Sequence, residues 1–455
     1  MNLKTRLYDK TYEFEDVKEV LAKASEEKSG DSLAGVIAEN KLERIAAKDV
    51  LSNLTVHDLR EHPVAPYEKD AVTRIIQDDL DETVYNEIKN KTIGEMREWI
   101  LDQDVKSEDI LRASRGMTSE VIAAISKIMG NLDLVYAGNK IHVEATCNTT
   151  IGKQGVLASR LQPNHPVDDV EGVMASTLEG LSYGIGDAVL GLNPSIDTFD
   201  STLAIWNTLG KIRDKYHIPT QTCVLSHVTT QMEVLNSGKG SADLCFQSIA
   251  GSQISLEAFG VSVKMLEEAN TLFREKGSAK GKNVMYFETG QGAELSSEGH
   301  WNSDQQTMEC RCYGLARHYE PFLVNTVVGF IGPEYIYDTK QLLRAGLEDV
   351  FCGHLHGLPM GCDVCYTNHM PVDQNDCETL LMLLANSGCH YVMGLPQGDD
   401  IMLMYQSTGF QDVAAVRETF QKRPVKEFED WMIRWGIWEN GHLTKRAGDP
   451  TIFLK

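Results

Sequence analysis

Glu288 ends a short apolar run and is followed by a turn with two glycines, in the stretch Met285-Tyr-Phe-Glu-Thr-Gly-Gln-Gly292. Asp363 follows a second run of this kind, and Arg160 and Gln162 lie at the end of a third. Ionised carboxylates accept hydrogen bonds and balance positive charge, whereas an amide both donates and accepts. Two acids beside an amide would therefore hold a small molecule that carries an ammonium group.

These residues belong to a set of eight short apolar runs, most of which end in a turn with a polar side chain at the exit. Asn193 follows the run Ala188–Leu192 and, with Arg160, would suit a hydroxyl group, while Gln247 follows the run Leu244–Phe246. If the polar side chains that follow all eight runs lie at the same end of the sheet, they predict one active-site mouth. Besides the run that ends at Glu288, the runs are Val156–Leu161, Ala188–Leu192, Thr222–Leu225, Leu244–Phe246, Val324–Ile331, Leu358–Cys362 and His390–Leu395.

The segments between these runs show the periodicity of helices. From about residue 150 the sequence therefore predicts a repeated unit of strand, glycine-bearing loop and helix. Strand starts fall roughly 20 to 40 residues apart, which fits parallel strands joined by crossover helices. Eight such units over about 250 residues favour a closed (β/α)8 TIM barrel, with an open doubly wound sheet as the alternative. In a TIM barrel the C-terminal ends of the strands carry the chemistry, which gives the polar exits a common place.

The barrel is predicted to span residues 141–400, after an α-helical N-terminal region over 1–140. Thr118 or Ser119 caps one helix of that region, Gly130 stops it, and Gly138-Asn139 marks a turn before the barrel. Residues 401–455 are predicted to hold the last barrel helix and a short helical C-terminal extension. Other helices of the N-terminal region are expected at Val17–Ala24, Leu42–Leu51, Ala71–Leu80 and Met96–Leu101.

Composition narrows the class of protein. The 455 residues are 42% hydrophobic, which supports a large core, and Lys+Arg 43 against Asp+Glu 66 gives a formal charge of -23. That charge disfavours nucleic acid and anionic membrane surfaces as partners. The first residues lack an apolar segment and no run approaches ~18 apolar residues, so we expect a soluble, cytoplasmic protein. Ten irregularly spaced cysteines are typical of reduced thiols.

Other motifs carry weaker signals. Gly290-Gln-Gly292 lacks the third glycine of a dinucleotide-binding loop, and Cys362-Asp-Val-Cys365 is a lone pair of cysteines without the second pair that a zinc site needs. His354 and His356 precede a strand instead of following one, so we expect a polar-loop role for them and no metal site.

Six longer segments resemble the large (heavy) subunit of ethanolamine ammonia-lyase, and the resemblance covers essentially the whole chain. The segments are Arg160-Leu-Gln-Pro-Asn164, Gly186-Asp-Ala-Val-Leu-Gly-Leu-Asn-Pro194, Tyr286-Phe-Glu-Thr-Gly-Gln-Gly292, Gly329-Phe-Ile-Gly-Pro-Glu-Tyr335, Met360-Gly-Cys-Asp-Val-Cys-Tyr-Thr-Asn-His369 and Gly394-Leu-Pro-Gln-Gly-Asp-Asp-Ile-Met402. The resemblance implies an adenosylcobalamin-dependent radical lyase that converts ethanolamine to acetaldehyde and ammonia. It further implies a small (light) subunit, an assembly of several large–small pairs, and association with a bacterial microcompartment.

The resemblance also implies roles for individual residues. From the chemistry of such a reaction, we expect Glu288, Asp363 and Arg160 to be catalytic, with Glu288 handling protons. Substrate ligands would be Glu288, Asp363, Gln162, Asn193 and Phe330. Cobalamin contacts would come from Arg160, Leu161, Gln162, Pro194, Phe246, Gln247, Ser296 and Met402.

Two other functions remain open at this point. A metal-dependent barrel hydrolase would use His354, His356, Asp363 or the cysteines, and it predicts bound metal and activity without cobalamin. A non-catalytic cobalamin- or amine-binding component predicts binding without turnover, although the charge density of Arg160, Glu288 and Asp363 argues against it.

Overall fold

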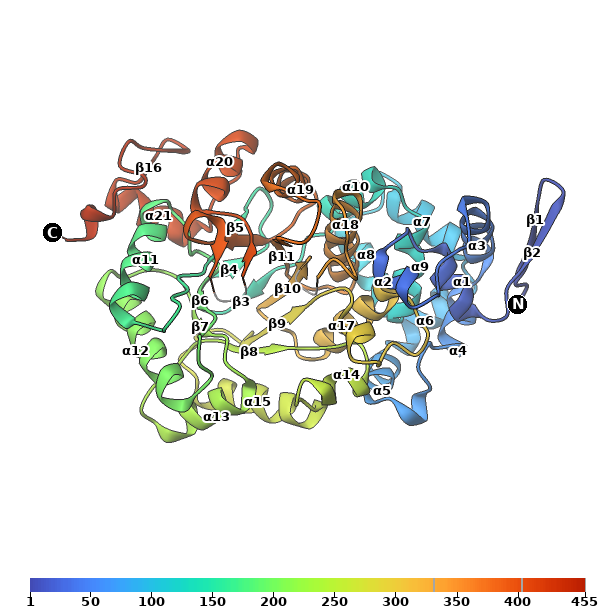
Figure 1. The fold of residues 1–455 in the computed structure, drawn as a ribbon, viewed down its shortest axis with the longest axis horizontal. Helices are drawn as coiled ribbons and strands as arrows, with labels where there is room; N and C mark the ends of the chain where they lie inside the picture. The colour runs from blue at the N-terminus through green and yellow to red at the C-terminus, as the bar shows by residue number, and fades with distance from the viewer. Residues whose placement is uncertain (330–331, 402–403, 455) are drawn as a thin grey trace.

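The computed structural model describes residues 1–455 except 330–331, 402–403 and 455, and at its centre lie eight parallel strands (Figure 1). Around the sheet they follow the order β7-β6-β5-β13-β11-β10-β9-β8. Barrel strands that follow one another in the chain lie side by side, and the last of them, β13, pairs with the first, β5. The strands are β5 (Ala158–Leu161), β6 (Val189–Leu192), β7 (Thr222–Val224), β8 (Cys245–Ser248), β9 (Met285–Thr289), β10 (Leu323–Val328), β11 (Met360–Val364) and β13 (Tyr391–Gly394).

The remaining seam lies between β7 and β8, where the backbone N–H groups of Asp243 and Leu244 donate to the carbonyl of Thr222 at 3.3 and 3.2 Å. The sheet is therefore nearly closed, which confirms the predicted TIM-like barrel over the open sheet. All six residues of β10 are buried. Burial on both faces of a parallel sheet explains why the strands appear in the sequence as continuous apolar runs.

Helices follow the strands and cover the barrel (Figure 1). Several begin at an acid whose side chain accepts a backbone N–H of the first turn, as Asp304 does from Thr307 and Asp338 from Gln341. The helices are α11 (Val170–Ser182), α12 (Phe199–Lys215), α13 (Val228–Ser237), α14 (Gln253–Ala258), α15 (Val263–Lys276), α16 (Ala293–Ser296), α17 (Gln305–His318), α18 (Thr339–Leu355), α19 (Gln374–Asn386) and α20 (Phe410–Phe420).

The N-terminal region is mainly helical, as predicted, but it begins with a hairpin of β1 (Lys4–Leu7) and β2 (Lys10–Glu13). Gly138, expected in a turn, lies inside α10. A Cβ there would stand 2.7 Å from the carbonyl oxygen of Ser387, so the glycine allows close packing. The helices are α1 (Val17–Ala24), α2 (Ser29–Leu33), α3 (Lys41–Asn53), α4 (Val56–Glu61), α5 (Ala71–Asp78), α6 (Glu82–Ile88), α7 (Ile93–Leu101), α8 (Ser107–Ser114), α9 (Ser119–Lys127) and α10 (Asn131–Lys140).

Buried ion pairs join this N-terminal region to α17 and α18. Arg311 of α17 contacts Asp70 at 3.0 Å and Glu120 at 2.6 Å, and all three side chains are at most 1% exposed. Further pairs are Lys28–Glu348 at 2.8 Å and Lys127–Asp304 at 2.6 Å, which are also fully buried. Buried charges need partners, so these contacts fix the N-terminal region against the barrel.

A small sheet forms from one segment between β11 and β13 and two segments after β13, and only the part beyond residue 400 is predicted to be helical. It consists of β12 (Tyr366–Thr367), β15 (Tyr405–Gln406) and β14 (Asp399–Asp400), in that order. Beyond α20 the chain forms α21 (Lys426–Trp435), then the short strands β16 (Trp438–Glu439) and β17 (His442–Leu443). The C-terminal extension is thus only partly helical.

Within the described part of the chain, no helix combines the length and apolar character that a membrane span requires.

Candidate active site

An ion pair inside the barrel joins Arg160 of β5 to Glu288 of β9. Arg160 is 1% exposed, and its Nη1 donates to Glu288 Oε1 at 2.6 Å and to the hydroxyl of Tyr286 at 2.7 Å. Tyr286 in turn donates to the same Glu288 oxygen at 2.9 Å, and Asn325 of β10 adds its Nδ2 at 3.3 Å. Residues two apart in a strand share a face, which explains why Tyr286 and Glu288 both point inward.

The charge state of Arg160 is firmly fixed. Burial opposes its charge, but the neighbouring Tyr286, Glu288 and Asp363 hold the pKa of the guanidinium above its ordinary value. Its Nη2 is buried and has no hydrogen-bond partner among the described residues. An unpaired buried donor is costly, so this atom is suited to bind a ligand oxygen.

Asp363 of β11 is the second acid of the site. Its carboxylate accepts the hydroxyl of Tyr405 at 3.0 Å and the hydroxyl of Ser407. Burial raises the pKa of Asp363 to about 7, although Ser407 and Arg160 act in the opposite direction. A carboxylate that titrates near neutrality in a buried site is suited to bind a cation.

Amides occupy the neighbouring strand ends. Gln162 follows β5, and its Nε2 donates to Asp400 of β14 at 2.6 Å. Asn164 donates its Nδ2 to the other oxygen of Asp400 at 3.2 Å and accepts the backbone N–H of Asn193 at 3.1 Å. One hydrogen-bonded chain therefore connects Gln162 with the backbone of Asn193.

A cavity of about 360 Å³ lies at this mouth. Its polar wall includes Asn193, Glu288 and Tyr405, while most of the remaining wall is apolar. Such a combination of a few polar groups with apolar walls is typical of a small-molecule site. The apolar side chains that line it include Pro194, Leu225, Phe246, Ile249, Phe259, Ala293 and Val327.

The predicted cofactor contacts lie in different places. Pro194 and Phe246 line the cavity, and Ser296 is exposed at the end of α16, next to the cavity wall. Leu161 instead packs on Gly180 of α11, on the helix side of the barrel. Gln247 also faces the helices, because its Oε1 accepts the backbone N–H of Val228 at the start of α13. The predicted cofactor contact Met402 and the predicted substrate contact Phe330 both lie outside the described residues.

Sequence reasoning missed five residues that hold the acids and amides in place, although some left a signal. Tyr286 stands two residues before Glu288, and Asn325 is a polar residue within an apolar strand. Tyr405 and Ser407 come from the predicted C-terminal extension over 401–455, and Asp400 is the last residue of the predicted barrel. Only the folded structure brings all three to the mouth.

The expected polar-loop role of His354 and His356 is wrong, because both side chains are buried at the end of α18. His354 contacts His390 at 3.0 Å, with the Nε2 of one ring against the Nδ1 of the other. His356 contacts the hydroxyl of Ser119 at 3.0 Å. These histidines therefore serve the packing of the barrel against the N-terminal region.

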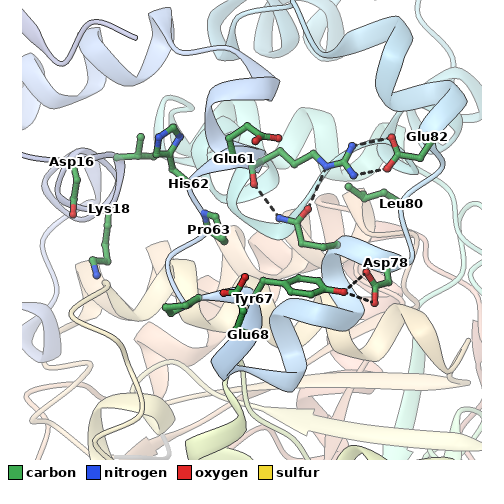
Figure 2. A pocket seen from close by; sticks show the side chains of 14 residues that line it. Asp16, Lys18, Glu61, His62, Pro63, Tyr67, Glu68, Asp78, Leu80 and Glu82 are labelled. Atoms are coloured by element: carbon green, nitrogen blue, oxygen red, sulfur yellow. Dashed lines mark hydrogen bonds and ion pairs between the residues drawn. The ribbon is translucent and has the colours of Figure 1, made fainter.

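A larger groove, of about 860 Å³, lies among α1, α4 and α5 of the N-terminal region (Figure 2). Several of its polar side chains bind one another. The hydroxyl of Tyr67 donates to Asp78 at 3.0 Å, and Arg60 pairs with Glu82. Because this groove lacks the buried, converging acids of the barrel mouth, the mouth is the better candidate for chemistry.

Comparisons with known proteins agree with the resemblance noted in the sequence. A family model described as the ethanolamine ammonia lyase large subunit (EutB) matches residues 12–446. The ethanolamine ammonia-lyase large subunits of Salmonella typhimurium (strain LT2) and Escherichia coli (strain K12) are each 54% identical over 454 residues, covering 100% of both chains. Together with the barrel, these matches show that the chain belongs to the ethanolamine ammonia-lyase large subunit family.

Proposed function

We propose that this chain is the catalytic subunit of an adenosylcobalamin-dependent ethanolamine ammonia-lyase, which converts ethanolamine to acetaldehyde and ammonia by a radical reaction. The observation that carries the proposal is the ion pair between the buried Arg160 and the partly buried Glu288, with Asp363 close enough to influence the pKa of Arg160. One cation between two acids leaves a net negative site, which suits a ligand that carries one positive charge.

The two ends of ethanolamine would meet different groups. Asp363 and Gln162 would bind the ammonium group, because both present acceptor oxygens. Arg160 and Asn193 would bind the hydroxyl, and the unpaired Nη2 of Arg160 supplies a donor for its oxygen. Glu288 contacts Arg160 on the hydroxyl side and would exchange a proton with the amine as it migrates.

Adenosylcobalamin, when bound, supplies the radical that removes hydrogen from the substrate carbon. The residues at the mouth fit such a large and mostly neutral group. Pro194, Phe246 and Phe259 offer an apolar wall, and Ser296 stands at the exposed rim. Leu161 and Gln247 would contribute only through their main chains, since their side chains face the helices. The protein would hold the substrate beneath the cofactor and exclude water.

A partner protein is part of the proposal. A cavity of about 360 Å³ is too small to enclose a corrin with its nucleotide tail, which leaves room for a second protein surface to cover the remainder. The names of the relatives as large subunits support a small subunit as that surface. We further propose an assembly of several large–small pairs and a place within a bacterial microcompartment, as the family resemblance implies.

The direct test combines the chain with its small subunit, adenosylcobalamin and ethanolamine. We expect acetaldehyde and ammonia to form in equal amounts, and neither to form when adenosylcobalamin is left out. Turnover that depends on an added metal ion and not on adenosylcobalamin would contradict the proposal.

A pH dependence follows from the buried acid. Asp363 binds ammonium only as the carboxylate, and burial raises its pKa to about 7 in the free enzyme. Protonation below that pH removes the charge, whereas a primary ammonium group stays charged up to about pH 9. We therefore expect kcat/KM for ethanolamine to rise about tenfold per pH unit up to about pH 7 and then to level off.

The rise should disappear in Asp363→Asn, whose side chain does not titrate. Asp399→Asn is the matched control, because Asp399 is exposed and its contact is with Gln406. Initial rates at subsaturating ethanolamine across this pH range provide the measurement. An identical profile in Asp363→Asn would assign the titration to another group.

A further inference from the structure

The side-chain amide of Gln162 is held by a residue from outside the barrel strands. Its Nε2 donates to Asp400 Oδ2 at 2.6 Å, and Asn164 donates to Asp400 Oδ1 at 3.2 Å. Gln162 is fully buried, and Asp400 is 1% exposed. Asp400 belongs to β14, whose partner strand β15 carries Tyr405 at the cavity wall. The small sheet thus reaches into the mouth and contacts the end of β5.

This contact decides which way the amide faces. An ionised carboxylate has only acceptor oxygens, so the NH₂ end of Gln162 must point to Asp400 and the carbonyl Oε1 must point away from it. Oε1 is buried and has no hydrogen-bond partner among the described residues. Gln162 stands two residues after Arg160 and continues its inward direction. A buried carbonyl oxygen without a donor is costly, so a ligand donor would relieve that cost.

We propose that Asp400 is a positioning residue for substrate selectivity: it holds the Gln162 carbonyl oxygen toward the ammonium group of ethanolamine and so favours an amine over a hydroxyl. This inference rests on the proposed function, in which Gln162 is an ammonium ligand. An ammonium group has three donors and no acceptor, whereas a hydroxyl both donates and accepts. An amide turned the other way would present two N–H groups, which repel an ammonium group but can bind a hydroxyl oxygen.

The test variant is Asp400→Asn, in the complete complex of both subunits with adenosylcobalamin. Asparagine can donate as well as accept, so Gln162 is no longer restricted to one orientation. We expect KM for ethanolamine to rise about 10- to 100-fold, the usual effect of losing a hydrogen bond to a charged group, with a smaller fall in kcat. The inhibition constant of ethane-1,2-diol should change little or decrease. We define the selectivity ratio as the inhibition constant of ethane-1,2-diol divided by KM for ethanolamine. In Asp400→Asn this ratio should therefore fall by about tenfold or more.

Two variants separate positioning from a general structural role. Asp400→Glu retains a group that only accepts, and we expect it to restore the selectivity ratio toward the wild-type value. Asp399→Asn changes an exposed neighbour in the same strand, and its ratio should equal that of the wild type. A ratio that falls equally in Asp399→Asn and Asp400→Asn would overturn the inference, because the effect would then follow from loss of charge on β14.

A double-mutant cycle shows whether Asp400 acts through Gln162. Gln162→Leu removes the carbonyl oxygen and should itself lower the selectivity ratio. Adding Asp400→Asn to it should cause no further fall, whereas additive effects would show that Asp400 acts by another route. Melting temperatures identify any variant that fails to fold. If Asp400→Asn does not fold, Gln162→Leu alone decides, because an unchanged ratio in that variant would contradict the inference.

A failure of the inference about Asp400 can be told apart from a failure of the proposed function. If the wild-type complex does not convert ethanolamine, the proposed function fails. If the wild type is active while Asp400→Asn keeps both its KM and its selectivity ratio, only the inference about Asp400 fails.

Discussion

Replacing Glu288 by glutamine should lower turnover of ethanolamine by about 10²-fold or more, the scale of positioned acid–base catalysis. Glutamine has nearly the same size and can still accept a hydrogen bond from Arg160 or Tyr286. It cannot take up a proton at neutral pH, so the proton transfers of amine migration lose their carrier. Glu288 also pairs with Arg160 at 2.6 Å, so the substitution removes the negative charge that balances the guanidinium.

The measurement is kcat at saturating ethanolamine and adenosylcobalamin. Glu275→Gln on α15 is the control, because Glu275 is exposed and lies outside the cavity lining. The melting temperature of each variant establishes that the loss is not one of folding. Near-normal turnover in Glu288→Gln would remove Glu288 from the mechanism.

Replacing Arg311 by methionine should destabilise the protein by about 3–5 kcal/mol, the usual effect of removing one partner of a buried ion pair. Arg311 is fully buried between Asp70 and Glu120, and it also donates to the hydroxyl of Thr73 at 2.7 Å and to the carbonyl of Gly251 at 2.8 Å. Methionine fills much of the volume but leaves two carboxylates without their cation.

Denaturant midpoints of the variant and the wild type test this expectation. Arg112→Met is the matched control, because Arg112 pairs with Glu87 on the surface, where the side chains are 59% and 47% exposed. Exposed pairs of this kind contribute at most about 1 kcal/mol, so the control should unfold near the wild-type midpoint. Equal shifts in the two variants would contradict a special role of the buried pairs.

The barrel could be predicted from the sequence because its strands are buried on both faces. Each predicted strand, from the one at Arg160 to the one before Gln397, is present in the structure. The hairpin β1–β2 was missed, because two strands of four residues give too little alternation to distinguish them from a helix or loop. Gly138 was misread as a turn because glycine is also used where two backbones approach closely, which depends on a contact distant in the sequence.

The candidate site was predictable where its residues stand at strand ends. Glu288 and Asp363 follow apolar runs, and barrel topology alone places such exits around one mouth. The contacts of Asp400, Tyr405 and Ser407 were not predictable, because their partners lie on other strands and no local pattern records them. The directions of Leu161 and Gln247 depend on the exact strand register, where a shift of one residue reverses the face.

The pairing of β13 with β5 has a consequence for biosynthesis. During translation the edge of β5 that pairs with β13 stays unpaired until β13 has been synthesised. The hydrogen bonds from Tyr405 and Ser407 to Asp363 can form only later, because both residues follow β13 in the chain. Exposed strand edges promote aggregation, so a nascent chain at this stage would depend on chaperones. Products that end before β13 would accordingly keep this edge exposed and be prone to aggregate.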